Sequence, residues 1–234
     1  STLNWLDKQS SSAAAYSDGY PIEFLDGAAN PNINVSAFPT PTTISVSNNS
    51  LAYVWTGGAI TVPLLKKSGT SSLTRVETAA DAITGIEING GSFIASNTFD
   101  GAFTTVLSDT TPNGTFVKSG LSTMTLSASS PTYDGAILIQ QGTLKVSNAN
   151  ALGTTNGGTT IASGATLDLN DQIFPHEPVT VSGSGDVGIG AIIDTTTGTG
   201  VAHNLTDVTL VGDTTLGCPN GGRWDIRVRS SSGP

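Results

Sequence analysis

The sequence predicts an all-β protein: a right-handed parallel β-helix whose coils of about 23–26 residues stack into a solenoid. Three observations predict it, namely a composition that favours strands and turns, short apolar alternations along the chain, and an internal repeat. Of the 234 residues, 34 are Thr, 27 are Ser and 28 are Gly, and only 12% are charged. Thr favours strands and Ser and Gly favour turns, whereas long surface helices need Ala, Leu, Glu, Lys and Arg.

The predicted strands are short runs in which apolar and polar side chains alternate, bounded by Gly, Asn, Asp or Pro. Residues 86–88, 137–139 and 144–146 are examples. No window of helical length carries an apolar stripe at helical spacing, which excludes a helix-rich fold. We expect the inward positions of the alternation to form the core: Val46, Ile60, Val62, Ile86, Ile88, Phe93, Ile137, Ile139, Leu144, Val146, Leu167, Leu169, Val179 and Val181.

The internal repeat sets the expected coil length. Shifting the chain by 51 residues aligns residues 67–69 (Lys-Ser-Gly) with residues 118–120 (Lys-Ser-Gly), and later aligns Phe93 with Leu144. A weaker match follows about 23 residues further on, where Leu167 answers Leu144. Two coils per 51-residue shift give about 23–26 residues per coil, a period typical of solenoids whose units bury one another's apolar faces. The same stacking predicts a solvated surface ion pair between Lys145 and Asp168.

The chain is expected to form one β-helix module over residues 1–234, with residues 1–40 as an N-terminal capping region and residues 41–234 as stacked coils. The first nine residues, STLNWLDKQ, lack the basic and apolar regions of a signal peptide. We therefore expect a fragment of a larger secreted protein, monomeric and covalently joined to other domains. Its single cysteine, Cys218, allows no internal disulfide.

Charge and motif content exclude several function classes. With 9 Lys and Arg against 18 Asp and Glu, the net charge is −9, which argues against nucleic acid or anionic lipid as a partner. No run of 18 apolar residues exists, so membrane insertion is not expected. His176 and His203 have no Cys or carboxylate at metal-ligand spacing, and no nucleophile or phosphate-binding motif occurs. The sequence predicts neither an enzyme nor a metal or other cofactor.

One segment resembles a known family. Residues 116–153 read FVKSGLSTMTLSASSPTYDGAILIQQGTLKVSNANALG. This resembles the autotransporter-associated β-strand repeat, whose members follow roughly K-x-G-x-G-T-L-T-L-S, N-x-Y-x-G, I-x-x-G-T-L-x-V and N-x-x-A-L-G. Residues 121–124 depart from the usual glycine-rich stretch, and Pro131 and Thr132 replace the commoner Asn-Thr. The resemblance implies a bacterial β-helix that is secreted or exposed at the cell surface, and it carries over no catalytic residue.

The aromatic residues suggest a ligand. Flat rings stack on sugars while Asn and Asp bond to hydroxyl groups, so an uncharged, hydroxyl-rich surface with a few rings suits a neutral polysaccharide. Tyr53 and Trp55 share one side of a strand, and Tyr133 lies in a turn. The chain is thus expected to be a non-catalytic carbohydrate-binding module, for example for a plant cell-wall glycan. The predicted ligand-binding residues are Tyr53, Trp55, Tyr133, Asp134, Asn48 and Asn49.

Two other function classes stay open. The chain is alternatively a structural or adhesive passenger or stalk segment of a bacterial surface protein, in which Trp5 and Trp55 cap the open end of the core, as terminal coils require. A β-helix polysaccharide lyase or hydrolase ranks third, because such enzymes need clustered acids and the sequence shows no clear cluster.

Overall fold

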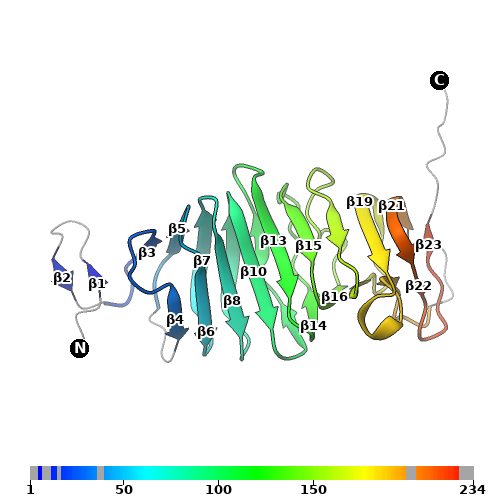
Figure 1. Ribbon diagram of the computed structural model, residues 1–234, viewed down its shortest axis with the longest axis horizontal. Coiled ribbons are helices and arrows are strands. Elements are labelled where there is room, and N and C mark those ends of the chain that lie inside the picture. The colour runs from blue at the N-terminus through cyan, green and yellow to red at the C-terminus, as the bar shows by residue number, and fades with distance from the viewer. Residues whose placement is uncertain (1–4, 7–11, 15–16, 36–39, 199–203, 227–234) are drawn as a thin grey trace, which may run out of the picture.

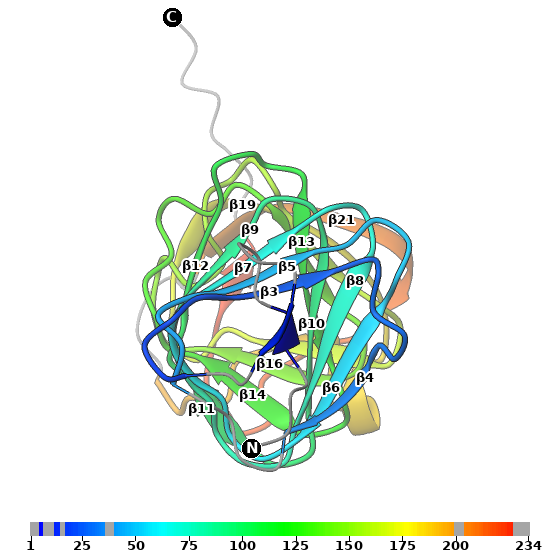
Figure 2. The same ribbon diagram turned by 90° about the vertical axis from the view of Figure 1, so that its left-hand side faces the viewer.

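The computed structural model describes residues 5–6, 12–14, 17–35, 40–198 and 204–226. These residues form a right-handed parallel β-helix of about nine turns, which confirms the predicted fold class. The strands stand side by side along the long axis (Figure 1), and the view down that axis shows the chain circling a common interior (Figure 2). Helical structure among the described residues is limited to the 3-10 turn Asp186–Gly188.

Three parallel sheets form the sides of the coil. The ten-stranded sheet contains, in spatial order, β4 (Asn32–Val35), β6 (Tyr53–Gly57), β8 (Ser72–Glu77), β10 (Gly91–Asn97), β13 (Gly114–Ser119), β15 (Ala136–Ile139), β17 (Thr159–Ile161), β19 (Phe174–Gly183), β21 (Asn204–Thr214) and β23 (Asp225–Ile226). The five-stranded sheet contains β3 (Ile22–Leu25), β5 (Ile44–Ser47), β7 (Thr61–Ser68), β9 (Ala82–Ile88) and β12 (Val106–Ser108). The six-stranded sheet contains β11 (Gly101–Phe103), β14 (Thr123–Leu126), β16 (Gly142–Val146), β18 (Ala165–Asp168), β20 (Ile192–Ile193) and β22 (Leu216–Gly217).

The sheets do not all run the length of the solenoid. The five-stranded sheet accompanies the N-terminal coils and the six-stranded sheet the C-terminal coils, and in Figure 2 they lie at opposite sides of the interior. Outside the solenoid, β1 (Trp5–Leu6) and β2 (Ala13–Ala14) pair antiparallel. Strands β3 and β4 already belong to the solenoid sheets, so the first described coil begins within residues 1–40.

Strand register measures the length of one coil. Leu65, Ile86 and Leu107 stack on consecutive strands of the five-stranded sheet, so the residue number rises by 21 with each coil there. From β4 to β19, the numbers of partner residues in the ten-stranded sheet differ by 20 to 23. Most coils are therefore at or below the lower end of the expected length. The six-stranded sheet reaches further into the expected range, since the partners Leu167 and Ile192 differ by 25.

The shorter coil explains why the sequence matches itself at a shift of 51. Two coils account for 42 residues, as from Leu65 to Leu107. The remaining nine residues of the 51-residue shift take the chain from the five-stranded sheet to the ten-stranded sheet. Lys67 accordingly lies on β7 in the five-stranded sheet, while its counterpart Lys118 lies on β13 in the ten-stranded sheet. The sequence repeat is thus two coils plus one side, and not two coils as the sequence alone suggested.

The core is the one that the alternation predicts. All fourteen predicted core residues, from Val46 to Val181, are at most 1% exposed. Leu144 and Leu167 pair in register on β16 and β18, as the 23-residue match predicted. Because each fully buried Val, Leu or Ile stabilises the fold by about 1.5–3 kcal/mol, this stacked column of side chains dominates stability.

Acidic side chains tie neighbouring coils together at the corners. Asp26 accepts hydrogen bonds of 2.9–3.0 Å from the backbone N–H groups of Asn49, Ser50 and Leu51 in the following coil. These bonds lower the pKa of the Asp26 carboxyl to about 2. A negative charge at this corner therefore links two coils, although no sequence motif marks it.

The predicted pair of Lys145 and Asp168 exists, but it is not a solvated surface pair. The two side chains lie in register on β16 and β18, with Nζ and Oδ2 3.5 Å apart. Asp168 is only 2% exposed, and its Oδ2 also accepts a 2.7 Å hydrogen bond from the Thr195 hydroxyl. The carboxylate is covered because the chain after β20 folds over it, which the pairing of two strands could not indicate.

Candidate functional site

The two aromatic residues of β6 lie in the core. Tyr53 and Trp55 share one side of the strand, as predicted, but both are 0% exposed and Val54 between them faces outward. Phe24 packs against both rings, with centroids 5.6 and 4.9 Å away, and the Tyr53 hydroxyl donates a 2.6 Å hydrogen bond to the Leu25 carbonyl. The prediction that these rings are exposed is wrong, because alternation shows which residues share a side and not which side faces water.

Tyr133, in the turn before β15, is also 0% exposed. Its hydroxyl accepts a 2.9 Å hydrogen bond from the Phe116 N–H and donates one of 3.1 Å to the Ala136 carbonyl. Burial raises the pKa of the phenol well above its usual value. The prediction of an exposed ring is wrong here too, since the ring of a solenoid turn can point inward between stacked coils.

The two predicted asparagines serve contacts between coils. Asn48 is 0% exposed, and its Nδ2 donates to the carbonyls of Leu51 at 2.5 Å and Ser72 at 2.8 Å. Asn49 is exposed, and its Oδ1 accepts a 3.3 Å hydrogen bond from the Thr70 N–H. The Asn48 side chain is therefore unavailable to a ligand in solution, and Asn49 is engaged by the next corner.

The six predicted ligand-binding residues do not form one site. Asp134 accepts hydrogen bonds from the Thr154 hydroxyl and, at 3.1 Å, from Asn156 Nδ2, again in the following coil. The turn that holds it precedes β15, four strands along the ten-stranded sheet from β6, or about 19 Å at a strand spacing of about 4.8 Å. The structure thus separates Tyr133 and Asp134 from the group around β6.

Two buried lysines are the polar feature that sequence analysis missed. Lys67 and Lys118 are 0% exposed, and each ammonium group is enclosed by three backbone carbonyls. Burial lowers the pKa of both lysines to about 8. The signal in the sequence was the repeated Lys-Ser-Gly, which above served only to align the two copies of the repeat. Lys67 Nζ donates to Ser68, Gly69 and Gly90, and Lys118 Nζ donates to Ser119, Gly120 and Gln141, at distances of 2.6 to 3.3 Å.

The glycine of each Lys-Ser-Gly is required by the preceding coil. Gly69 and Gly120 have φ values of 78° and 84°, in the left-handed region. A Cβ atom at these positions would lie 2.2 Å from the Asn48 carbonyl oxygen and 2.4 Å from that of Asn97. Any side chain would therefore push the coils apart. The three residues together form a structural corner, in which the lysine donates hydrogen bonds to carbonyl groups at the end of its own strand and in the next coil.

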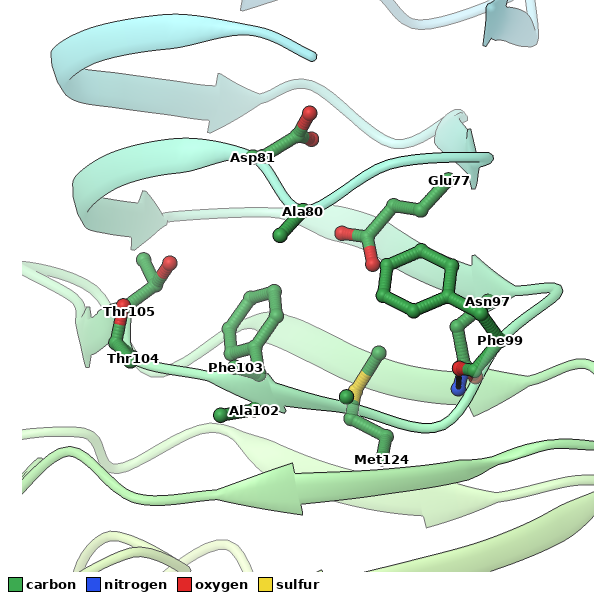
Figure 3. Close-up of a pocket in the computed structure, with 11 residues that line it drawn as sticks. Glu77, Ala80, Asp81, Asn97, Phe99, Ala102, Phe103, Thr104, Thr105 and Met124 are labelled. Carbon is green, nitrogen blue, oxygen red and sulfur yellow. Dashed lines mark hydrogen bonds between the residues drawn. The ribbon is translucent and has the colours of Figure 1, made fainter. Parts of the chain in front are cut away.

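One small cavity lies beside the first strand of the six-stranded sheet. Figure 3 shows Glu77, Phe103 and Met124 among the residues that line it, and its volume is about 10 Å³, room for about one water molecule. Burial, then the nearby Asp81 carboxylate, raise the pKa of Glu77 to about 7, although Arg75 opposes this. Such an acid suits proton transfer. Here Asp81 is bound by Arg75 at 2.8 Å, and the cavity has no room for a sugar ring.

A second hollow opens at the C-terminal end of the described solenoid. It is a shallow depression of about 380 Å³. Trp224 is half-buried there, with its Nε1 donating a 2.9 Å hydrogen bond to the Gly217 carbonyl. Leu216 lies in register with the buried Ile192, so the depression lies on the inward side of the last described coil. Its residues are Leu216, Gly217, Cys218, Trp224, Asp225 and Ile226.

Metal-binding and membrane-spanning features are both missing from the part of the chain that the structure describes. Within the described ranges, no group of three His, Cys, Asp or Glu side chains is arranged to hold a metal ion. His176 is exposed on β19, and His203 lies outside the described residues. In that same part of the chain, no helix has the length and apolar character needed to span a bilayer.

Comparison with known proteins adds no relative. A scan against protein-family models found no match, and neither did searches of curated proteins and of solved structures. The β-helix itself is therefore established by the structure, while the resemblance of residues 116–153 to the autotransporter-associated repeat rests on its motif alone.

Proposed function

We propose that the chain is a structural segment, a stalk, of a secreted or cell-surface bacterial protein. One observation carries the proposal: the aromatic and polar side chains that suggested a ligand site are used inside the solenoid. Tyr53, Trp55, Tyr133 and Asn48 are all 0% exposed. The chain thus commits its rings to filling the interior and its polar groups to joining coils, which suits a rigid spacer.

The competing proposal, a polysaccharide-binding module, has weaker support. Stacking on a sugar needs a ring face open to solvent, preferably two faces near each other. Among the Tyr and Trp residues whose side-chain exposure the structure describes, Tyr20, just before β3, is 66% exposed and Trp224, just before β23, is half-buried. These two rings lie at opposite ends of the solenoid, so they offer no common platform for one glycan chain.

Rigidity over the full length is the direct test of a stalk. Asn32 and Thr209 are exposed, and register places them in one row across the ten-stranded sheet, eight strands apart. At a strand spacing of about 4.8 Å they are about 38 Å apart. Spin labels at Asn32→Cys and Thr209→Cys, in a Cys218→Ser background, should give one narrow distance distribution near that value. A broad distribution centred at a much shorter distance would overturn the stalk.

Affinity electrophoresis against a panel of neutral polysaccharides tests the competitor. A stalk should migrate at the same rate with and without each polymer. Retardation that disappears in Tyr20→Ala or Trp224→Ala, with an unchanged melting temperature, would restore the binding module. Tyr53→Phe is a matched control, because it removes only a hydroxyl group inside the core and should not alter migration.

A further inference from the structure

The outward positions of the ten-stranded sheet form rows that cross β6 to β19. We call this surface the uncharged face, because the outward residues of these rows are Val, Ile, Leu, Ala, Pro, Ser and Thr. One flanking row contains Ser72, Ser92 and Thr115 in register. The central row, which continues to Thr180, contains Val54, Thr74, Ile94, Val117, Leu138 and Thr160.

The other two sheets have charged residues at their outward positions. Glu23, Lys66 and Glu87 lie in one outward row of the five-stranded sheet, where Lys66 Nζ is 3.1 Å from Glu87 Oε2. Lys145 and Asp168 lie in register in the six-stranded sheet. In a chain of net charge −9, one side of the coil is therefore left without charged rows.

We propose that the uncharged face binds the uncharged face of a second copy of this chain, forming a symmetric dimer by sheet-on-sheet packing. Two chains of charge −9 repel, and the repulsion is least where neither presents a charge. The central row offers aliphatic side chains to bury, and the hydroxyl groups beside it bond to one another or to water. This departs from the monomer expected from the sequence, and it does not depend on the stalk proposal.

The size of the face suits a dimer. The seven strands from β6 to β19 present one to three outward residues each in these rows, about 17 in all, and at about 4.8 Å by 6.8 Å per residue they cover about 550 Å² per copy, or about 1,100 Å² for the pair. A specific protein–protein interface should bury at least about 1,000 Å² in total. Val117, at the middle of the central row, points outward but is only 3% exposed, and its partners in register are Ile94 and Leu138. A sheet face of this kind can pack against its two-fold copy at the usual sheet separation of about 10 Å.

Sedimentation equilibrium of the full chain tests this inference. The wild type should form dimers at tens of micromolar, and the dimer should strengthen as NaCl rises from about 0.05 to about 0.5 M, because salt screens the repulsion between the two chains. Leu138→Glu places a charge in the central row and should weaken the dimer at least about 30-fold. Thr74→Lys, of opposite sign in the same row, should do the same.

Thr125→Glu is the matched control. Thr125 faces outward on the six-stranded sheet, in register with Lys145, so the new carboxylate meets a positive neighbour and lies outside the proposed interface. This variant should dimerise like the wild type, and all three variants should keep the wild-type melting temperature. A wild type that stays monomeric at about 200 μM at every salt concentration would overturn the inference. So would equal dimerisation of folded Leu138→Glu and Thr125→Glu.

Discussion

The two copies of the sequence repeat, residues 67–97 and 118–148, fold alike but occupy different sides of the coil. Lys67 and Lys118 are both buried under three carbonyl groups, and each lies in register with an isoleucine of the next coil, Ile88 or Ile139. The first lysine belongs to the five-stranded sheet and the second to the ten-stranded sheet. The repeated sequence therefore specifies a strand, a corner and the following strand. It does not specify which sheet of the coil these elements join.

The two copies differ in the residues on their outer surfaces. Lys66, immediately before the first copy, forms an ion pair with Glu87 on the outer surface, and the residues 51 positions later, Val117 and Leu138, form an apolar pair in the uncharged face. Glu77 of the first copy corresponds to Ala128 of the second. The two copies thus share the same corner but differ in their outer surfaces. A substitution in one corner can therefore be compared with the equivalent substitution in the other.

The largest effect is expected in the shared core. Ile86→Asp and Ile137→Asp each bury an unpaired charge, which costs several kcal/mol, so both variants should be unfolded or aggregated at 25 °C. Far-UV circular dichroism and thermal melting measure this. Because the two isoleucines have equivalent positions in the core, both variants should lose stability to a similar extent. A variant that melts at the wild-type temperature would show that the two positions are not equivalent.

The next largest effect, a pH-dependent change in stability, is expected only in the first copy. The raised pKa of Glu77, about 7 against an ordinary 4.5, means that the folded state binds the proton more tightly than the unfolded state. This contribution to stability is complete below about pH 4.5 and is lost as the pH rises through 7. Glu77→Gln should therefore be more stable than the wild type at pH 8, by on the order of 3 kcal/mol, and equal to it at pH 4.5.

Glu177→Gln provides a second measurement of the same kind. Burial raises the pKa of Glu177 to about 7, although a 2.7 Å hydrogen bond from Thr159 opposes this. Urea unfolding at pH 4.5 and pH 8 compares both variants with the wild type. A gain for Glu77→Gln that is the same at the two pH values would show that the carboxyl does not titrate between them.

A smaller and matched loss is expected at the two corners. Lys67→Met and Lys118→Met keep the length of the side chain but remove the three hydrogen bonds that each ammonium group donates, so each variant should lose about 1–3 kcal/mol of unfolding free energy. The two losses should agree to within about 0.5 kcal/mol, since the carbonyl sets correspond. Denaturant unfolding at pH 7 measures both. A loss at only one position would mean that the lysine serves its sheet and not the repeated corner.

The smallest effect belongs to the exterior of the first copy. The Lys66 side chain is 43% exposed, so its pair with Glu87 is screened by solvent. Lys66→Ala should change stability by about 0–1 kcal/mol, and the change should shrink in high salt. A loss of several kcal/mol that persists in high salt would show that the pair is part of the packed structure.

Sequence patterns predicted the fold and the core but not the use of the rings. Alternation and repetition identified Ile86, Ile137 and Leu144 as core residues, because burial of apolar side chains follows the period of the strand. The same patterns could not show that Trp55 points inward, because alternation identifies the residues that share a side of a strand but not which side faces the core. The coil length was overestimated because the 51-residue shift does not reveal that nine of its positions turn the chain onto another side.

Oxidative cross-linking tests the relation between repeat and coil most directly. In a Cys218→Ser background, Val117→Cys with Leu138→Cys joins residues that pair in register, and neighbouring strands about 4.8 Å apart suit a disulfide. Val117→Cys with Thr143→Cys joins residues that would be neighbours if two coils made up the 51-residue shift. We predict that the first variant forms an intramolecular disulfide under mild oxidation and the second does not. A disulfide in the second variant and none in the first would contradict a repeat of two coils plus one side.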